Sequence, residues 1–320
     1  MAGADLRRRG ADLPPWPWPP GLAPGWHALW ALFAEAAQGH EPTGFEMSCR
    51  LAPAGAESAR LLRGLAPTGP RAALAALPSR LGLPEAAAQA FTAGLADGHQ
   101  VFLSVEQGRA GLVAKLYLEW PVPVAVAGPG AEARARPALQ MRGWKWPLDP
   151  HTARPVPGAE GAARLRTTDY WRWPLARPEA AVALLHGVRG GADDVRATLA
   201  CAAAALERAL ARARPGFDTA LLLAHEEGSP RASCAVRLHD SGLRADDLRH
   251  ELALLAGRWG LDRGLLDKLL AGIGPRELGW LAAGAGPDGQ GFLTLYADAR
   301  PQDFPLAPCS VQAAPAAPYQ

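Results

Sequence analysis

The sequence predicts an α+β fold in which ten antiparallel strands, grouped as five pairs, alternate with helical segments. The first observation behind this prediction is the string GLVAKLYLEW at Gly111–Trp120, where every second residue is apolar and the residues between include a lysine, a tyrosine and a glutamate. A period of two is typical of a strand with one buried face. Second, such strings recur in pairs, and third, the segments between the pairs carry apolar residues at helical spacing.

The five predicted strand pairs follow one another along the chain. Short turns that contain glycine, proline or both join four of them, and the longer Pro/Gly-rich segment Pro147–Ala163 joins the third. In chain order the pairs are Gly44–Leu51 with Glu57–Arg63, His99–Gln107 with Gly111–Trp120, Leu139–Trp146 with Arg164–Trp173, Phe217–Glu226 with Arg231–Asp240, and Glu277–Gly284 with Gly291–Ala297.

Helical patterns fill the gaps between these pairs. In Arg244–Trp259, for example, leucines and a tryptophan recur every three or four residues and form one apolar stripe. Prolines and glycines in Pro121–Pro137 argue against a helix there. The predicted helices are Trp26–Ala37, Arg71–Leu77, Pro84–Gly94, Pro178–Val188, Asp193–Arg214, Arg244–Trp259 and Arg263–Leu270.

The strands carry polar residues on the face opposite their apolar one. Because the helices have apolar stripes, we expect them to cover the apolar face of the sheet. A sheet of ten antiparallel strands usually curls or closes, and closure with the helices outside makes the polar face the wall of a lumen. The polar face is expected to include Glu46, Ser48, Arg50, Lys115, Tyr117, Glu119, Arg142, Trp144, Trp146, Arg164, Arg166, Thr168, Tyr170, Arg237, His239, Thr294, Tyr296 and Asp298. Such a lumen has room for an anionic, partly apolar ligand.

Composition narrows the class of protein. The chain has 320 residues and a net charge of +2, which gives no reason to expect a nucleic-acid partner. It has no apolar run of the ~18–20 residues that a membrane span needs. The cysteines show no C-x-x-C spacing, so we expect free thiols, no zinc site and a cytoplasmic protein; they are Cys49, Cys201, Cys234 and Cys309. We also expect a monomer.

The chain is expected to hold a single folded domain at 24–300. Residues 1–23 end in PPWPWPP and predict an extended arm, from which Trp16 and Trp18 can dock on the domain. Residues 301–320 are rich in proline and alanine and predict a flexible tail. Two separate α+β domains, divided near Pro174–Pro178, fit less well because the spacing of strand pairs runs across that point.

Three short strings resemble the ABBA prenyltransferases over about Pro24–Pro301. Residues 45–50, FEMSCR, are closest to the Glu-x-Ser-Cys-(Lys/Arg) first strand of the cyanobactin-type peptide prenyltransferases, residues 114–117 resemble a Lys-x-Tyr strand, and residues 294–296 resemble a last-strand tyrosine motif. The resemblance implies a ten-stranded antiparallel barrel of five αββα repeats with helices outside. The chain departs from the family's pattern at His239, where a tyrosine is common, and in the long segment Pro147–Ala163.

The resemblance also implies roles for residues of the polar face. The diphosphate leaving group needs fixed cations, for which we expect Arg50, Lys115, Arg166 and Arg237. Aromatic rings shield the allylic cation, for which we expect Tyr117, Tyr170, Tyr296 and, in place of a fourth tyrosine, His239. Trp144 and Trp146 are expected in the acceptor pocket, with a place in the core as an equal alternative. No metal site is expected, because His225 and His239 have no third ligand.

We expect Glu46 to be the general base, with Glu119 as the runner-up. The alternative for Glu46 is an ion pair with Arg50, four residues further along the same strand. The implied reaction moves a dimethylallyl or geranyl group from an allylic diphosphate to a nucleophilic side chain of a ribosomal peptide. A small aromatic acceptor such as an indole or a phenol, and a ligand-binding barrel without catalysis, are the alternatives. No permanently bound cofactor is expected, although Mg²⁺ can accompany the diphosphate.

Overall fold

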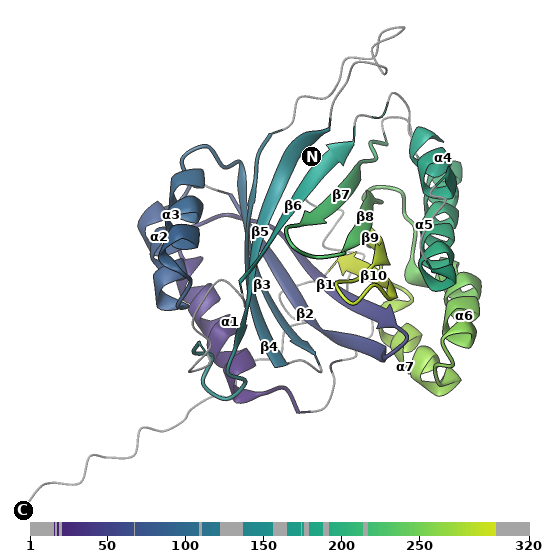
Figure 1. The fold of residues 1–320 in the computed structure, drawn as a ribbon, viewed down its shortest axis with the longest axis horizontal. Coiled ribbons are helices and arrows are strands. Elements are labelled where there is room, and N and C mark those ends of the chain that lie inside the picture. The colour runs from purple at the N-terminus through teal and green to yellow at the C-terminus, as the bar shows by residue number, and fades with distance from the viewer. Residues whose placement is uncertain are drawn as a thin grey trace, which may run out of the picture.

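Ten antiparallel strands close into one barrel in the computed structural model (Figure 1). Around the barrel the order is β1-β10-β9-β8-β7-β6-β5-β4-β3-β2, so each strand pairs with its neighbours in sequence and β1 pairs with β10. The strands are β1 (Pro42–Ala52), β2 (Gly55–Leu65), β3 (Gln100–Gly108), β4 (Gly111–Glu119), β5 (Ala138–Leu148), β6 (Arg166–Trp173), β7 (Leu221–Glu226), β8 (Ala232–Arg237), β9 (Leu278–Ala285) and β10 (Gly291–Asp298). The predicted closed antiparallel barrel is confirmed.

The structure describes residues 16, 18, 21–66, 68–108, 111–121, 137–155, 165–173, 175, 179–187, 192–213 and 217–298. Most of segment 121–137, where no helix was expected, and the tail 301–320 lie outside the described residues. The domain boundaries at 23/24 and 300/301 therefore stay predictions. Two tryptophans of the expected arm are described. Trp16 is 3% exposed, and the guanidinium carbon of Arg276 lies 5.6 Å from the centroid of the Trp16 ring. Trp18 packs edge-on against Trp26.

Helices flank the barrel on two sides (Figure 1). One side carries α1 (Pro24–Ala36), α2 (Arg71–Arg80) and α3 (Glu85–Gly94), and the other carries α4 (Glu179–Gly187), α5 (Asp193–Arg212), α6 (Arg249–Arg258) and α7 (Arg263–Ile273). The predicted helix at 244–259 begins with a short 3₁₀ turn, η1 (Ala245–Leu248), before α6. No described helix is long and apolar enough to cross a membrane.

The core lies between the outer face of the barrel and these helices. Leu116 and Leu118 of β4, Val236 of β8 and Leu293 of β10 are fully buried, as the period-two pattern requires. Each buried leucine stabilises the fold by roughly 1.5–3 kcal/mol. Among the described cysteines, Cys49, Cys201 and Cys234 are free and buried. The apolar face thus points outward to the helices, and the other face is left for the lumen.

The fourth strand pair is shorter than predicted. After β8 the chain turns at Asp240, which has a φ of 68°, and the Ser241 hydroxyl donates a 2.6 Å hydrogen bond to the Leu238 carbonyl. Before β7, the Thr219 hydroxyl donates to the Arg237 carbonyl at 2.7 Å. These side-chain hydrogen bonds take the place of ladder bonds at the ends of both strands.

Candidate active site

The inner face of the barrel encloses a cavity of about 880 Å³ at the end where the hairpin turns lie. Because the strands alternate in direction, all five strand-to-strand turns fall at this end and the helical connections fall at the other. The register then sets which side chains share a level of the lumen. Lys115 of β4 stands opposite Lys145 of β5, and Ser48 of β1 stands between Arg60 of β2 and Tyr296 of β10.

Basic side chains outnumber carboxylates around this cavity. Among the described residues that line it, six side chains are cationic, and we call them the cationic cluster. They are those of Arg50, Arg60, Lys115, Lys145, Arg166 and Arg231. The carboxylates are those of Glu57, Glu106, Glu226 and Asp288. Three of the expected anion-binding residues, Arg50, Lys115 and Arg166, are therefore brought together here. The surplus of positive charge favours an anionic ligand.

Glu106 is the counterion at one side of the cavity. Its carboxylate lies 3.0 Å from Nη2 of Arg60 and is hydrogen-bonded by Nζ of Lys115. Burial alone would raise the pKa of Glu106, but Arg60 and Lys115 outweigh it and hold that pKa below its usual range. Burial lowers the pKa of Lys115 to about 8, against the opposing effect of Glu106.

Arg60 keeps one donor unused in this arrangement. Its side chain is 11% exposed, and Nη1 has no hydrogen-bond partner among the described residues. A buried guanidinium nitrogen without a partner costs free energy, so a ligand that accepts its hydrogen bond is favoured. This orphaned donor points to an oxygen-rich anion as the natural occupant of the cavity.

Glu226 is the counterion at the other side. It is 3% exposed and accepts a 3.1 Å hydrogen bond from the Thr168 hydroxyl. Three cations surround it at longer distances: Arg231 at 3.5 Å, Arg166 at 3.8 Å and Lys145 at 3.9 Å. Burial, with repulsion from Arg231 and Lys115, holds the pKa of Lys145 well below its ordinary value. A bound anion would relieve that repulsion.

Three tyrosines border the cationic cluster deeper in the lumen. They are Tyr117, Tyr170 and Tyr296, and all three line the cavity. The rings of Tyr117 and Tyr170 lie 6.2 Å apart, and Nζ of Lys145 lies 6.0 Å from the centroid of Tyr170. Burial raises the pKa values of Tyr117 and Tyr296, so both phenols stay neutral. Neutral aromatic faces of this kind attract a cation.

Gly143 of β5 makes room for one of these rings. A Cβ at this position would lie 2.4 Å from Cε1 of Tyr117, the residue opposite it on β4. Gly143→Ala should therefore displace Tyr117 and destabilise the protein by about 1–3 kcal/mol, measured by urea denaturation. Gly44→Ala is the matched control, because a Cβ at Gly44 meets nothing within 4 Å. Equal stability of the two variants would contradict this placement of Tyr117.

Glu46 lies at the opposite end of the lumen from the cationic cluster. Its Oε1 is 3.4 Å from Nε2 of His239, while Arg50 instead stacks its guanidinium 4.4 Å above the ring of Phe292. The structure thus pairs Glu46 with His239 and not with Arg50. Glu119 accepts a 2.7 Å hydrogen bond from Gln140, and burial raises its pKa.

One expected anion-binding residue lies elsewhere. Arg237 does not join the cationic cluster: its guanidinium donates to the Asp218 carbonyl and contacts Asp240 at 3.2 Å, near the helical end. Trp144 and Trp146 belong to the hydrophobic core, the alternative that the sequence left open, and Trp146 also borders the cavity. The Trp144 indole packs edge-on against Phe91 of α3 at 5.6 Å, and the Trp146 indole N–H donates to the Leu81 carbonyl.

The sequence could not decide between the two placements of these tryptophans. A period of two fixes that Trp144 and Trp146 share a face, but β5 carries a cation on each face, Arg142 on one and Lys145 on the other. His239 also differs in placement from the expected fourth shield of the cation, since it lies against Glu46 and Trp280.

The sequence did not single out seven other charged residues of the described cavity lining: Glu57, Arg60, Glu106, Lys145, Glu226, Arg231 and Asp288. A signal for Glu106 was present, because Val101, Leu103 and Val105 alternate with Phe102, Ser104 and Glu106.

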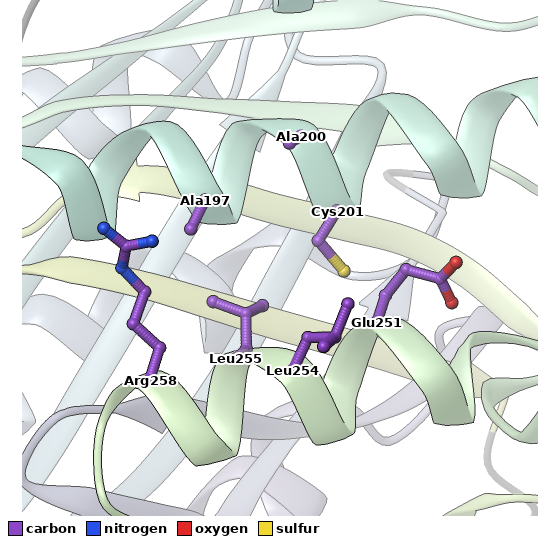
Figure 2. A pocket seen from close by; sticks show the side chains of 7 residues that line it. All are labelled: Ala197, Ala200, Cys201, Glu251, Leu254, Leu255 and Arg258. Atoms are coloured by element: carbon purple, nitrogen blue, oxygen red, sulfur yellow. The ribbon is translucent and has the colours of Figure 1, made fainter.

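A second hollow, of about 400 Å³, lies outside the barrel between α5 and α6 (Figure 2). Its lining is mostly alanine and leucine, with Glu251 and Arg258 at the sides. The one thiol in it, Cys201, is buried, and burial raises its pKa to about 12. The thiol is therefore not activated, and we take the lumen as the candidate active site.

No protein-family model and no curated protein matched the chain. Solved structures did match. A 5-dimethylallyltryptophan synthase from Streptomyces coelicolor is 13% identical, with 80% of this chain and 81% of that chain covered and a TM-score of 0.47. A 6-dimethylallyltryptophan synthase from Micromonospora olivasterospora, in complex with DMASPP and Trp, is 17% identical, with 80% and 82% covered and a TM-score of 0.42. A 6-dimethylallyl tryptophan synthase is 16% identical, with 86% and 95% covered and a TM-score of 0.43. Identities this low do not carry a function from one protein to another.

Proposed function

We propose that this protein is an enzyme that binds an allylic diphosphate in the cationic cluster and transfers its prenyl group to a nucleophilic acceptor. The observation that carries the proposal is the unused Nη1 donor of buried Arg60, in a cavity where six basic side chains outnumber the carboxylates among the described residues. The strings resembling the first, Lys-x-Tyr and last strands of ABBA prenyltransferases contribute Arg50, Lys115 and Tyr296 to the same lumen.

The cationic cluster fits the leaving group of this reaction. When the allylic C–O bond breaks, negative charge grows on the diphosphate, and fixed guanidinium and ammonium groups stabilise it. Arginine suits this role because its planar fork can donate two parallel hydrogen bonds to a phosphate. Arg60 contacts Glu106, Arg231 contacts Glu226 and Arg50 stacks on Phe292, so little reorganisation of these side chains is needed when a ligand binds.

The tyrosine rings fit the other product of that bond cleavage. The allylic cation must be kept from water until the acceptor attacks it. Tyr117, Tyr170 and Tyr296 are placed directly beside the cationic cluster, and each ring face can contribute about 0.5–2 kcal/mol of attraction to a cation.

Glu46 is the general base in this proposal. The acceptor enters the half of the lumen nearer the helical connections, its nucleophilic atom bonds to the allylic carbon, and its proton passes to the Glu46 carboxylate. The first-strand string favours a peptide acceptor from a ribosomal natural product. A small indole or phenol is the second candidate acceptor. We further propose that the protein acts as a monomer in the cytoplasm.

The affinity for a diphosphate should depend on pH. Below pH 8 Lys115 is protonated, since burial brings its pKa to about 8, and it attracts the anion. Above that pH the protonated fraction falls about tenfold per unit, so affinity falls as pH rises from 7 to 9.5. Phosphate groups with a pKa of about 6 are already ionised over that range. Isothermal titration calorimetry with a non-hydrolysable thiolodiphosphate analogue measures the affinity at each pH. In Lys115→Met the affinity should depend less on pH than in the wild type. A wild-type affinity that stays constant up to pH 9.5 would contradict this role of Lys115.

The test of the proposed function is transfer itself. The protein is incubated with dimethylallyl or geranyl diphosphate and with a panel of cyclic and linear peptides, tryptophan and simple phenols, with Mg²⁺ and with EDTA in parallel. Mass spectrometry should show an acceptor heavier by one prenyl group. Tight diphosphate binding with no mass gain for any acceptor would instead favour a ligand-binding barrel without catalysis.

A further inference from the structure

We infer that His239 is a positioning residue that holds the carboxylate of Glu46 in the orientation it needs as general base. The inference rests on the proposed function and adds a residue to it. The observation behind it is the 3.4 Å contact between Nε2 of His239 and Oε1 of Glu46, whose side chains are 30% and 17% exposed. Such contacts are often long before substrate binds and shorten in the complex.

The backbone around His239 is fixed by hydrogen bonds on both sides. The Leu238 N–H donates to the Gly279 carbonyl at 2.8 Å, which continues the pairing with β9 beyond the end of β8. The Ser241 hydroxyl donates to the Leu238 carbonyl at 2.6 Å. Asp240, between them, adopts a φ of 68°. These contacts leave the Cα–Cβ bond of His239 little freedom.

The imidazole ring is also held by its neighbours on β9. A Cβ at Gly279 would lie 2.3 Å from Cε1 and 2.7 Å from Nε2 of His239, so the ring packs closely against a position that only glycine leaves open. The indole of Trp280 packs edge-on against the ring, with centroids 6.3 Å apart. Glycine and tryptophan together direct Nε2 toward Glu46.

The contact has a chemical consequence for the base. A glutamate has several rotatable bonds, and a base must lie within hydrogen-bond reach of the proton it accepts. When Nε2–H donates to Oε1, the carboxylate is held and Oε2 is left for the acceptor's proton. His239 then acts through Glu46 and makes no contact with the reacting atoms itself.

Two variants of equal side-chain length separate positioning from packing. Glutamine can place an amide N–H near the position of Nε2, whereas methionine fills the same space without a donor. His239→Met should lower kcat about tenfold, the effect of one charge-assisted hydrogen bond, and leave KM for the diphosphate unchanged. His239→Gln should recover most of kcat. The control is His225→Met, the same change at an exposed position on β7. Equal kcat values for His239→Met, His239→Gln and the wild type would overturn the inference.

A spectroscopic readout decides the question without catalysis. In protein labelled with ¹⁵N-histidine, the Nε2 resonance of His239 should move when Glu46 is changed to glutamine and should stay in place in Glu119→Gln. If the Nε2 resonance of His239 does not move in Glu46→Gln, the contact between the two side chains is refuted. If the wild-type protein transfers no prenyl group, the proposed function fails, and this measurement still accepts or rejects the contact between His239 and Glu46.

Discussion

Arg60→Met should lower the free energy of unfolding by about 3 kcal/mol and weaken binding of a diphosphate at least tenfold. Arg60 lies 3.0 Å from Glu106, and the side chains of the pair are 11% and 15% exposed. Removing one member of a buried ion pair leaves the other charge without compensation, which costs about 3–5 kcal/mol. The hydrogen bond from Lys115 to Glu106 remains, so we expect the lower end of that range.

Urea denaturation and calorimetric titration measure the two effects. Arg63→Met is the matched control, since Arg63 lies on the same strand but stacks on Phe45 outside the cavity, at 5.4 Å. The double variant Arg60→Met/Glu106→Gln should be less destabilised than the sum of its single variants, because the two side chains interact directly. Normal diphosphate affinity in Arg60→Met would remove the main support for the proposed binding site.

Glu46→Gln should lower kcat by about 10²–10⁴-fold, the usual contribution of a general base. Glutamine has nearly the same shape but cannot accept the acceptor's proton. Binding of the diphosphate should not change, because the described cavity lining holds the cationic cluster and not Glu46. Steady-state kinetics and titration with a thiolodiphosphate analogue separate the two quantities.

Glu119→Gln provides the comparison for that experiment. Glu119 is a second carboxylate expected toward this end of the lumen, and burial raises its pKa. If Glu119→Gln stops turnover while Glu46→Gln does not, then Glu119 is the general base and Glu46 is not. If neither variant alters kcat, the base is elsewhere and the inference about His239 fails with it.

Much of the barrel could be predicted because its strands carry a strong local signal. In strands such as β4 every second residue is apolar and the residues between include polar ones such as Lys115 and Tyr117, and a hairpin turn adjoins each of the clearest strands. Because the helices must cover the apolar face of the sheet, the polar face lines the lumen. This places residues such as Lys115 and Tyr296 inside it. The alternation is weakest on β5, where both faces mix charged and apolar residues, so the sequence left the tryptophans undecided between the core and the acceptor pocket.

The charge pairs of the cavity could not be predicted because they depend on register between strands. Arg60 and Glu106 are direct partners across β2 and β3 although a pair of helices separates them in the chain. Hydrophobic alternation fixes a strand's faces but leaves its offset along its neighbour open by steps of two residues. The contact of Glu46 with His239 likewise joins the first strand to the turn after the eighth.

The two ends of the barrel are built from different kinds of connection. Short hairpins such as Ala52–Gly55 and Gly286–Gly289 border the cavity mouth, while described helices lie in the connections β2–β3, β6–β7 and β8–β9 at the far end. Loop exchange at one rim should therefore leave the other rim's side chains in place. New hairpins could therefore be introduced to suit a longer isoprenoid, and the connections at the far end could be redesigned to suit another nucleophile. Each change could be made independently of the other.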